Sequence, residues 1–105
     1  MKVALTNVPP DRAEAIARAL VTEGLVACAN ILPVRSIYRW KGEVCDEPEC
    51  TLVLKVPARG IADLRTRLLA LHPYELPEFV VLDIDPAASL PAYVAWVESS
   101  GVQSS

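Results

Sequence analysis

Residues 25–56 read LVACANILPVRSIYRWKGEVCDEPECTLVLKV, and this stretch decides the fold. Two long extended runs flank Lys41-Gly42, a dipeptide typical of a tight two-residue turn. A turn at this point predicts an antiparallel hairpin in which Cys28 lies opposite Lys55 and the later pairs follow in step. The sequence therefore predicts one long hairpin at the centre of the fold.

The predicted hairpin is too long for a compact domain. Residues 25–40, as one straight strand, would span about 50 Å at about 3.3 Å per residue, whereas a compact chain of this length has a radius of gyration of about 13 Å. The hairpin must either overhang the domain or bend sharply at Pro33, and prolines 33 and 48 also predict a bulge or a sheet edge. We favour the overhang, which exposes strand edges and aromatic side chains that soluble proteins cover with a partner. The exposed side chains would be those of Ile37, Tyr38 and Trp40.

The rest of the chain supplies the elements of a two-layer α+β fold. Apolar periodicity predicts strands over 2–7 and 78–85, helices over 10–24 and 59–71, and a short last helix before a frayed tail at 99–105. With the hairpin, the order is β-α-β-β-α-β-α, which is the ferredoxin-like βαββαβ arrangement with a C-terminal helix. We expect one domain over residues 1–105, built on one antiparallel sheet.

One face of this sheet is expected to lack helices. Right-handed crossovers place both main helices over the face that carries Ala29 and Leu54, which leaves the face with Cys28 and Lys55 open. The chain is 52% hydrophobic, a high share for a small soluble domain, and the apolar run 79–82 is typical of a buried strand. We therefore expect the open face to pack against another subunit.

Charge and composition argue against several classes of function. The net charge is −3 at pH 7, whereas nucleic acids and anionic membranes select basic surfaces. No apolar run approaches the roughly 20 residues of a membrane span, and the start MKVALTNVPP turns polar too soon for a signal peptide. Three cysteines without CxxC spacing fit a reducing compartment. We expect a cytoplasmic protein that binds neither nucleic acid nor membrane.

Few residues are equipped for chemistry. His72, the single histidine, is a candidate metal ligand or acid/base group, or alternatively a cap at a helix end. Cys28 is a candidate soft metal ligand, or alternatively a small packed hydrophobe. Lys55 and Arg39 project from the hairpin and could meet an anion at a subunit boundary, or be simply solvated. Because no phosphate loop, nucleophile motif or structural zinc spacing is present in the sequence, we do not expect an enzyme.

Three segments, LVACANI, SIYRWKGEV and HPYELPE, carry a family resemblance by their order and spacing. Over residues 3–97 the chain resembles the CutA family of divalent-cation tolerance proteins. The resemblance implies a ferredoxin-like subunit in a tight homotrimer, with hairpins around neighbouring subunits and open sheet faces turned inward. It also implies divalent-metal binding, and an assembly similar to that of PII-type proteins, which bind nucleotides between subunits. The trimer interface is expected to include Ile37, Tyr38, Trp40, Tyr74 and Trp96.

The resemblance also implies a metal site. Cys28 matches the family cysteine in the ACANI segment, and His72 matches the histidine that opens HPYELPE. Thr6 stands where some members have a further cysteine, and Leu71 stands where some have a second histidine. Because these departures reduce the number of ligands, we expect weak binding of copper or another divalent cation by Cys28 and His72.

Three functions are consistent with these features. The leading hypothesis is a homotrimeric protein that binds a divalent metal, copper first, and takes part in tolerance to it. The second is a PII-like sensor that binds a small anionic ligand in a cleft between subunits, lined by Lys55, Arg39 and Glu78. The third is a rigid trimeric scaffold for a protein partner, without a small ligand of its own.

Overall fold

The computed structural model describes residues 1–100. The predicted order of elements is confirmed, and their bounds differ from the predicted ones by a few residues. The elements are β1 (Lys2–Val8), α1 (Pro10–Thr22), β2 (Cys28–Trp40), β3 (Glu43–Val56), a 3-10 turn (Ala58–Gly60), α2 (Ile61–Leu71), β4 (Val80–Asp83) and α3 (Pro91–Ser100).

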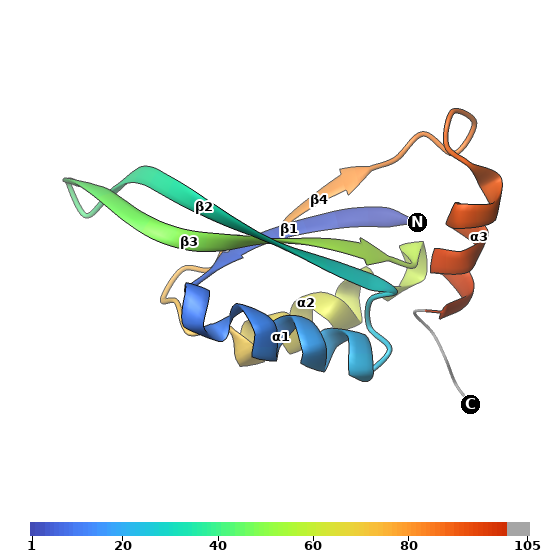
Figure 1. Ribbon diagram of the computed structural model, residues 1–105, viewed down its shortest axis with the longest axis horizontal. Coiled ribbons are helices and arrows are strands. Elements are labelled where there is room, and N and C mark those ends of the chain that lie inside the picture. Colours follow the sequence, from blue (N-terminus) through green and yellow to red (C-terminus); the bar gives the residue numbers. More distant parts are fainter. Residues whose placement is uncertain (101–105) are drawn as a thin grey trace.

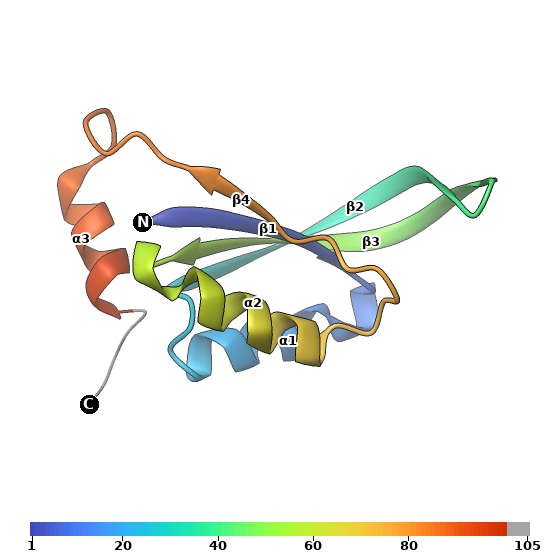
Figure 2. The same cartoon turned by 180° about the vertical axis from the view of Figure 1, so that it is seen from behind.

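The four strands form one antiparallel sheet in the order β2-β3-β1-β4. α1 and α2 lie side by side against one face of this sheet, and α3 lies at the end of the sheet next to the N-terminus (Figure 1, Figure 2). Within residues 1–100 no helix covers the opposite side of the strands, which we call the bare face. This is the predicted ferredoxin-like α+β arrangement.

The central hairpin forms with the predicted register. Pairing runs unbroken from Cys28 opposite Lys55 to the residues that flank the turn. Lys41 and Gly42 both have positive φ angles, 51° and 81°, as a two-residue type I′ turn requires. The turn chemistry therefore sets the pairing of all of β2.

Both strand prolines lie where a missing hydrogen-bond donor is tolerated. Pro33 belongs to β2, which is an edge strand. Pro48 lies two residues before Cys50, on the side of the turn, and the pairing of β3 with β1 begins at Cys50. At Pro48, β3 therefore has β2 as its single neighbour. The prolines mark sheet edges, and the alternative of a bulge is wrong because the pairing is continuous across them.

The hairpin overhangs the rest of the molecule. Because β1 accompanies β3 only as far as Cys50, residues 43–49 pair with β2 alone and project past the helices (Figure 1). The molecule measures 44 × 30 × 21 Å and has a radius of gyration of 14.5 Å, against about 13 Å for a compact chain of this length. The overhang is confirmed, and β2 does not fold back at Pro33.

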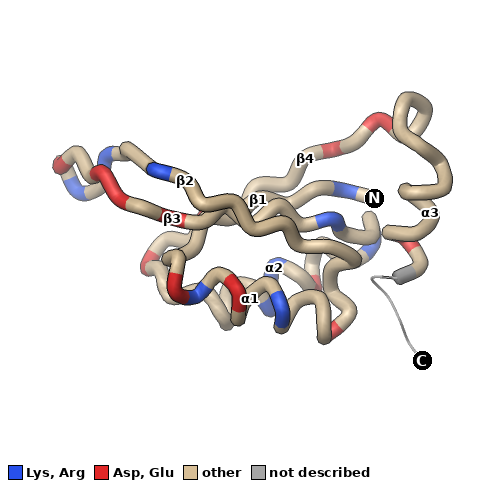
Figure 3. The backbone as a smooth tube through the Cα atoms, viewed as in Figure 1, with Lys and Arg blue, Asp and Glu red and all other residues tan. Residues whose placement is uncertain are grey.

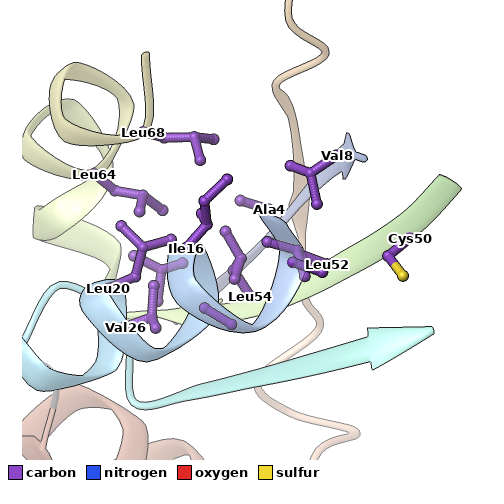
Figure 4. Close-up of a cluster of buried hydrophobic side chains, with 13 residues drawn as sticks. Ala4, Val8, Ile16, Leu20, Val26, Cys50, Leu52, Leu54, Leu64 and Leu68 are labelled. Carbon is purple, nitrogen blue, oxygen red and sulfur yellow. The ribbon is translucent and has the colours of Figure 1, made fainter. Parts of the chain in front are cut away.

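The core lies between the sheet and the two main helices (Figure 4). Gly24, with a φ of 74°, ends α1 in the left-handed conformation, and the N–H of Leu25 donates to the carbonyl of Leu20 at 3.0 Å. Each large side chain buried in this core contributes about 1.5–3 kcal/mol through the hydrophobic effect. The fully buried members are Ala4, Val8, Leu20, Leu52, Leu54, Val56, Leu64 and Leu68.

β4 is the second edge strand, and its side chains remain exposed in the single chain. The exposed fractions are 45% for Val80, 37% for Val81 and 45% for Leu82. The expectation of a buried fourth strand is therefore wrong for one chain, because β4 has a neighbouring strand on one side only. Val80 and Leu82 lie opposite Leu5 and Val3, so both point to the bare face.

α3 is tied to the start of β1 by charge. The Met1 amino group lies 2.7 Å from the Glu98 carboxylate, which also accepts a hydrogen bond from the Ala58 N–H at 3.0 Å. The tail was expected to fray from residue 99, but Ser99 belongs to α3, and residues 101–105 lie outside the described residues. Among residues 1–100 no helix is both long and apolar enough to span a membrane.

Thr6 carries a buried hydroxyl that has no hydrogen-bond partner among the described residues. Replacing it in Thr6→Val should raise the free energy of unfolding by about 1 kcal/mol, because an unsatisfied polar group leaves the core. Thr51→Val is the matched control, since the Thr51 hydroxyl donates to the Asn7 side-chain oxygen at 2.6 Å. That variant should lower stability by a similar amount. Urea denaturation measures both, and a destabilised Thr6→Val would contradict the prediction.

Candidate functional site

His72 is buried and both of its ring nitrogens are engaged. The residue ends α2, and its Nε2 lies 2.9 Å from the Asn7 carbonyl oxygen while its Nδ1 accepts a hydrogen bond from the Tyr74 N–H at 3.3 Å. This pattern requires the neutral tautomer that carries its hydrogen on Nε2. Burial is the main reason why the pKa of His72 is lowered, although the Asn7 carbonyl and the nearby Glu49 carboxylate oppose the shift. His72 therefore ties the loop after α2 to the end of β1.

Within one chain, Cys28 and His72 do not form a site. Cys28 begins β2 on the bare face, beside Lys55, which in turn pairs with Val3 of β1. His72 bonds to Asn7, four residues further along β1, which corresponds to about 13 Å. Among residues 1–100, no three or more His, Cys, Asp or Glu side chains are grouped so that they could hold a metal ion.

The three residues of the predicted anion cleft are also separate in one chain. The Lys55 ammonium contacts the Asn30 side-chain oxygen at the base of the hairpin. Arg39 lies beside the turn, about 36 Å further along β2 at 3.3 Å per residue. Glu78 accepts a long hydrogen bond of 3.4 Å from the Asn7 amide. A cleft that contains all three would need more than one subunit.

A cavity of about 520 Å³ lies between the overhanging hairpin and the loop that follows His72. Four residues predicted for the subunit interface line this cavity, which we call the hollow, together with Glu78. The fifth, Trp96, lies in α3, where its ring centroid is 5.6 Å from that of Tyr93. The lining residues are Asn7, Ser36, Ile37, Tyr38, Trp40, Glu47, Glu49, Tyr74, Glu75, Leu76 and Glu78.

The hollow combines carboxylates with aromatic rings. Its acidic residues come from the overhanging part of β3, where Figure 3 shows them, and from the loop that follows His72. Glu49 is only 7% exposed and accepts a hydrogen bond of 2.7 Å from the Tyr74 hydroxyl. Burial, and then this carboxylate, raise the pKa of Tyr74 well above its usual range. Tyr74 therefore stays protonated and continues to donate to Glu49.

Nothing in the sequence distinguishes Glu49 from the other acidic residues of its strand. Strand alternation places it on the same face as the exposed Glu47, and no local pattern separates the two residues. Its burial arises because the Tyr74 side chain, 25 positions away along the chain, packs against it. Only the folded chain, in which His72 fixes the loop against β1, brings these residues together.

A family model described as CutA1 divalent ion tolerance protein matches residues 2–100. The chain belongs to the CutA family. The three motif segments thus predicted the family correctly. The family is one of divalent-cation tolerance and PII-like proteins and is not a known enzyme family.

Individual relatives agree with this assignment. The divalent-cation tolerance protein CutA of Thermus thermophilus is 43% identical over 101 residues, which cover 94% of this chain and 96% of that protein. The structure of the PII-like protein CutA from Nostoc sp. PCC 7120 in apo form is 58% identical and has a TM-score of 0.92 over 93% of this chain and 94% of its own. The CutA homolog of Xenopus laevis is 35% identical over 92% of this chain, which spans 64% of that longer protein.

The lowered pKa of His72 predicts a pH-dependent stability. The unfolded chain binds a proton near the ordinary pKa of 6.5, whereas the folded chain binds it only at lower pH. Stability should therefore be complete above that value and should fall as the pH drops below it. Urea denaturation at fixed protein concentration, at about pH 7.5 and about pH 5.5, should show a smaller loss in His72→Gln, which keeps a donor and an acceptor but does not titrate. An equal loss in both proteins would contradict the prediction.

Proposed function

We propose that this CutA protein is a homotrimer that takes part in tolerance to divalent cations, and that it binds copper or another divalent metal between its subunits. The protein acts by binding rather than by catalysis. Family membership supports the tolerance role. The bare face of the sheet supports the assembly.

The exposed bare face is the observation that carries the trimer. Leu32, Val80 and Leu82 each leave 45% of their surface exposed, although they belong to strands of the central sheet. Exposed apolar surface of this kind marks an interaction site. The two edge strands β2 and β4 also present unpaired backbone groups that a neighbouring strand could pair with. Subunits that turn their bare faces inward would bury both features.

The metal site is proposed at the bare face, near Cys28. Its thiol is free and half-buried, and thiolates favour soft ions such as copper. Since one described chain does not group enough ligands, the remaining donors must come from neighbouring copies. His72 keeps a positioning role in this proposal, because coordination would break one of the two hydrogen bonds that its ring makes.

A second candidate is a PII-like sensor for a small anion. Lys55 favours it, since this half-buried ammonium on the bare face has no carboxylate partner among residues 1–100. Such an anion would bind near Lys55 and not beside Glu78, because the carboxylates of the hollow would repel it. The likeness to the PII-like protein from Nostoc is consistent with a ligand of this kind.

The trimer is tested by placing a charge on the bare face. The wild-type protein should have the native mass of three chains at micromolar concentration. Leu82→Glu should dissociate it, because three buried and unpaired carboxylates would oppose assembly. Val21→Glu is the matched control, since Val21 is 43% exposed but belongs to α1. Native mass spectrometry measures the assembly state of all three proteins. A Leu82→Glu variant that remains trimeric would contradict the proposal that the bare face forms the interface.

The metal site is tested by calorimetric titration of the reduced, metal-free protein with copper, with zinc as a comparator. Saturable binding at a fixed ratio per trimer is expected, and Cys28→Ser should abolish it because the thiolate is the proposed ligand. Cys45→Ser is the matched control, as Cys45 is another half-buried free cysteine but lies in the overhang. Copper binding that persists in Cys28→Ser would rule out Cys28 as the ligand.

A further inference from the structure

Glu49 is a buried carboxylate without a cationic partner in its own chain. Only 7% of its surface is exposed, and its one hydrogen-bond donor within residues 1–100 is the Tyr74 hydroxyl, which contacts Oε2. The adjacent His72 ring is neutral by its hydrogen-bond pattern. No Lys, Arg or amino terminus of the described chain pairs with Glu49. Because a carboxylate that leaves water needs a compensating charge, we expect a cation from outside this chain beside Oε1.

Lys55 is a half-buried ammonium that lacks a carboxylate in its own chain. It lies on the bare face at the base of the hairpin, where its Nζ contacts the Asn30 side-chain oxygen. An ammonium group has three donors, and none of the ion pairs within residues 1–100 includes Lys55. Exposed leucine and valine side chains share this face, so packing it against another subunit would remove the ammonium from water. A buried ammonium, like a buried carboxylate, needs a partner of opposite charge.

The other cations of the described chain are poorly placed to compensate Glu49 of another copy. Six Lys and Arg side chains already pair with a carboxylate of their own chain. Of the remaining three, Arg12 and Arg65 belong to α1 and α2, and Arg39 alternates to the helix side of β2. Lys55 is therefore the one cation among the strand residues of the bare face.

We propose that the Glu49 carboxylate of one subunit pairs with the Lys55 ammonium of the next subunit, and that three such pairs close the ring of the trimer. This inference rests on the trimer proposed above. Each pair would join Oε1 of Glu49, which accepts no hydrogen bond within residues 1–100, to a free N–H of Lys55. Tyr74 would remain bonded to Oε2 and hold the carboxylate in place. Every copy supplies one carboxylate and one ammonium, so the ring leaves neither charge unpaired.

The two charges cannot meet within one chain. They lie on the same face of β3, six positions apart, which corresponds to about 20 Å. This distance is about twice the Debye length at 0.1 M salt, so the two charges of one chain barely interact. The overhang extends past its own sheet and offers its bare face to another copy (Figure 1). A contact between two different positions on two copies is head-to-tail, and such contacts generate closed rings.

The pairing would also decide what the Lys55 ammonium does. A small anion at Lys55 and the carboxylate of a neighbouring Glu49 would use the same charge, so each excludes the other. If the pairing holds, Glu49 favours assembly only where residue 55 is positively charged. If Lys55 holds an anion, substitutions at the two positions act independently. The dependence of one position on the other is therefore the quantity to measure.

The test is a double-mutant cycle on the stability of the assembly. Sedimentation measures the share of trimer over a dilution series, in urea at a fixed concentration that half-dissociates the wild type at micromolar protein. Glu49→Gln keeps an acceptor for Tyr74 and should raise the midpoint concentration of dissociation at least about tenfold, because each interface loses a charge-assisted hydrogen bond. Lys55→Glu should raise the midpoint further, because two carboxylates would then meet. Adding Glu49→Gln to Lys55→Glu should lower it again about tenfold, since the amide removes this repulsion.

Glu47→Gln is the matched control for the loss of a carboxylate. Glu47 lies two positions from Glu49 on the same face of β3, but its side chain is exposed. This variant should shift the midpoint concentration less than about twofold, both alone and together with Lys55→Glu. Circular dichroism checks the fold of each variant. The regained assembly of the double variant is a result that a misfolded chain would not give.

Three results would count against the pairing. A Glu49→Gln effect of the same sign and size in the wild type and in Lys55→Glu would overturn the pairing and leave the trimer standing. A wild-type protein that is monomeric at micromolar concentration without urea would overturn the trimer, and the pairing with it. Stabilisation of the wild-type trimer by inorganic phosphate that is lost in Lys55→Gln would assign the ammonium to an anion instead.

Discussion

A mismatch between the lengths of neighbouring strands shapes this molecule. β3 has 14 residues and β1 has 7, so half of β3 has no partner on the side away from β2. The hairpin does not fold back over the sheet, because β2 and β3 stay paired without a break as far as the turn. The overhang therefore exposes strand edge, and its bare face forms one wall of the hollow. The hollow therefore contains residues, Tyr38 and Trp40 among them, that a shorter hairpin would not contain.

A small polar network holds the opposite wall in place. The His72 ring connects the carbonyl of Asn7 to the backbone of Tyr74, and the side chain of Asn7 accepts a hydrogen bond from Thr51. These contacts fix the loop after α2 against the end of β1, where its pairing with β3 stops. Tyr74 can therefore reach Glu49. The only histidine of the chain thus positions this loop, and the lone pair on its Nδ1 is already used as an acceptor for the Tyr74 N–H. Its neutral state also leaves the charge of Glu49 uncompensated.

Much of the fold could be predicted because local chemistry specifies it. Lys41-Gly42 defines a two-residue turn, strand periodicity defines the faces, and the chain length relative to strand rise demands the overhang. The exposure of Val80 and Leu82, the buried state of Glu49 and the hydrogen bonds of His72 could not be predicted in the same way. Each depends on which segments meet after folding, over separations of 25 positions for Glu49 and Tyr74 and 65 for His72 and Asn7. The motif segments identified the family. A motif gives the residue types of a site, but it does not show which residues from other segments will contact them after folding.

The two ends of the hairpin differ in the charge that they leave uncompensated. At the base, Lys55 is an ammonium without a carboxylate partner in the described chain, and Cys28 lies beside it on the bare face. In the overhang, Glu49 is a carboxylate without a cationic partner among residues 1–100. The distance along the strands prevents these charges from neutralising each other within one chain.

In an assembly that packs bare faces together, neighbouring copies would enclose the base of the hairpin, and the overhang would extend across them. Burial would then make the ammonium at the base more dependent on an anion or on a partner's carboxylate. The hollow would also face a neighbouring copy, because Glu47 and Glu49 lie on the same face of β3 as Lys55. The strand-length mismatch that requires a partner for the sheet thus also places the hollow at the expected subunit boundary.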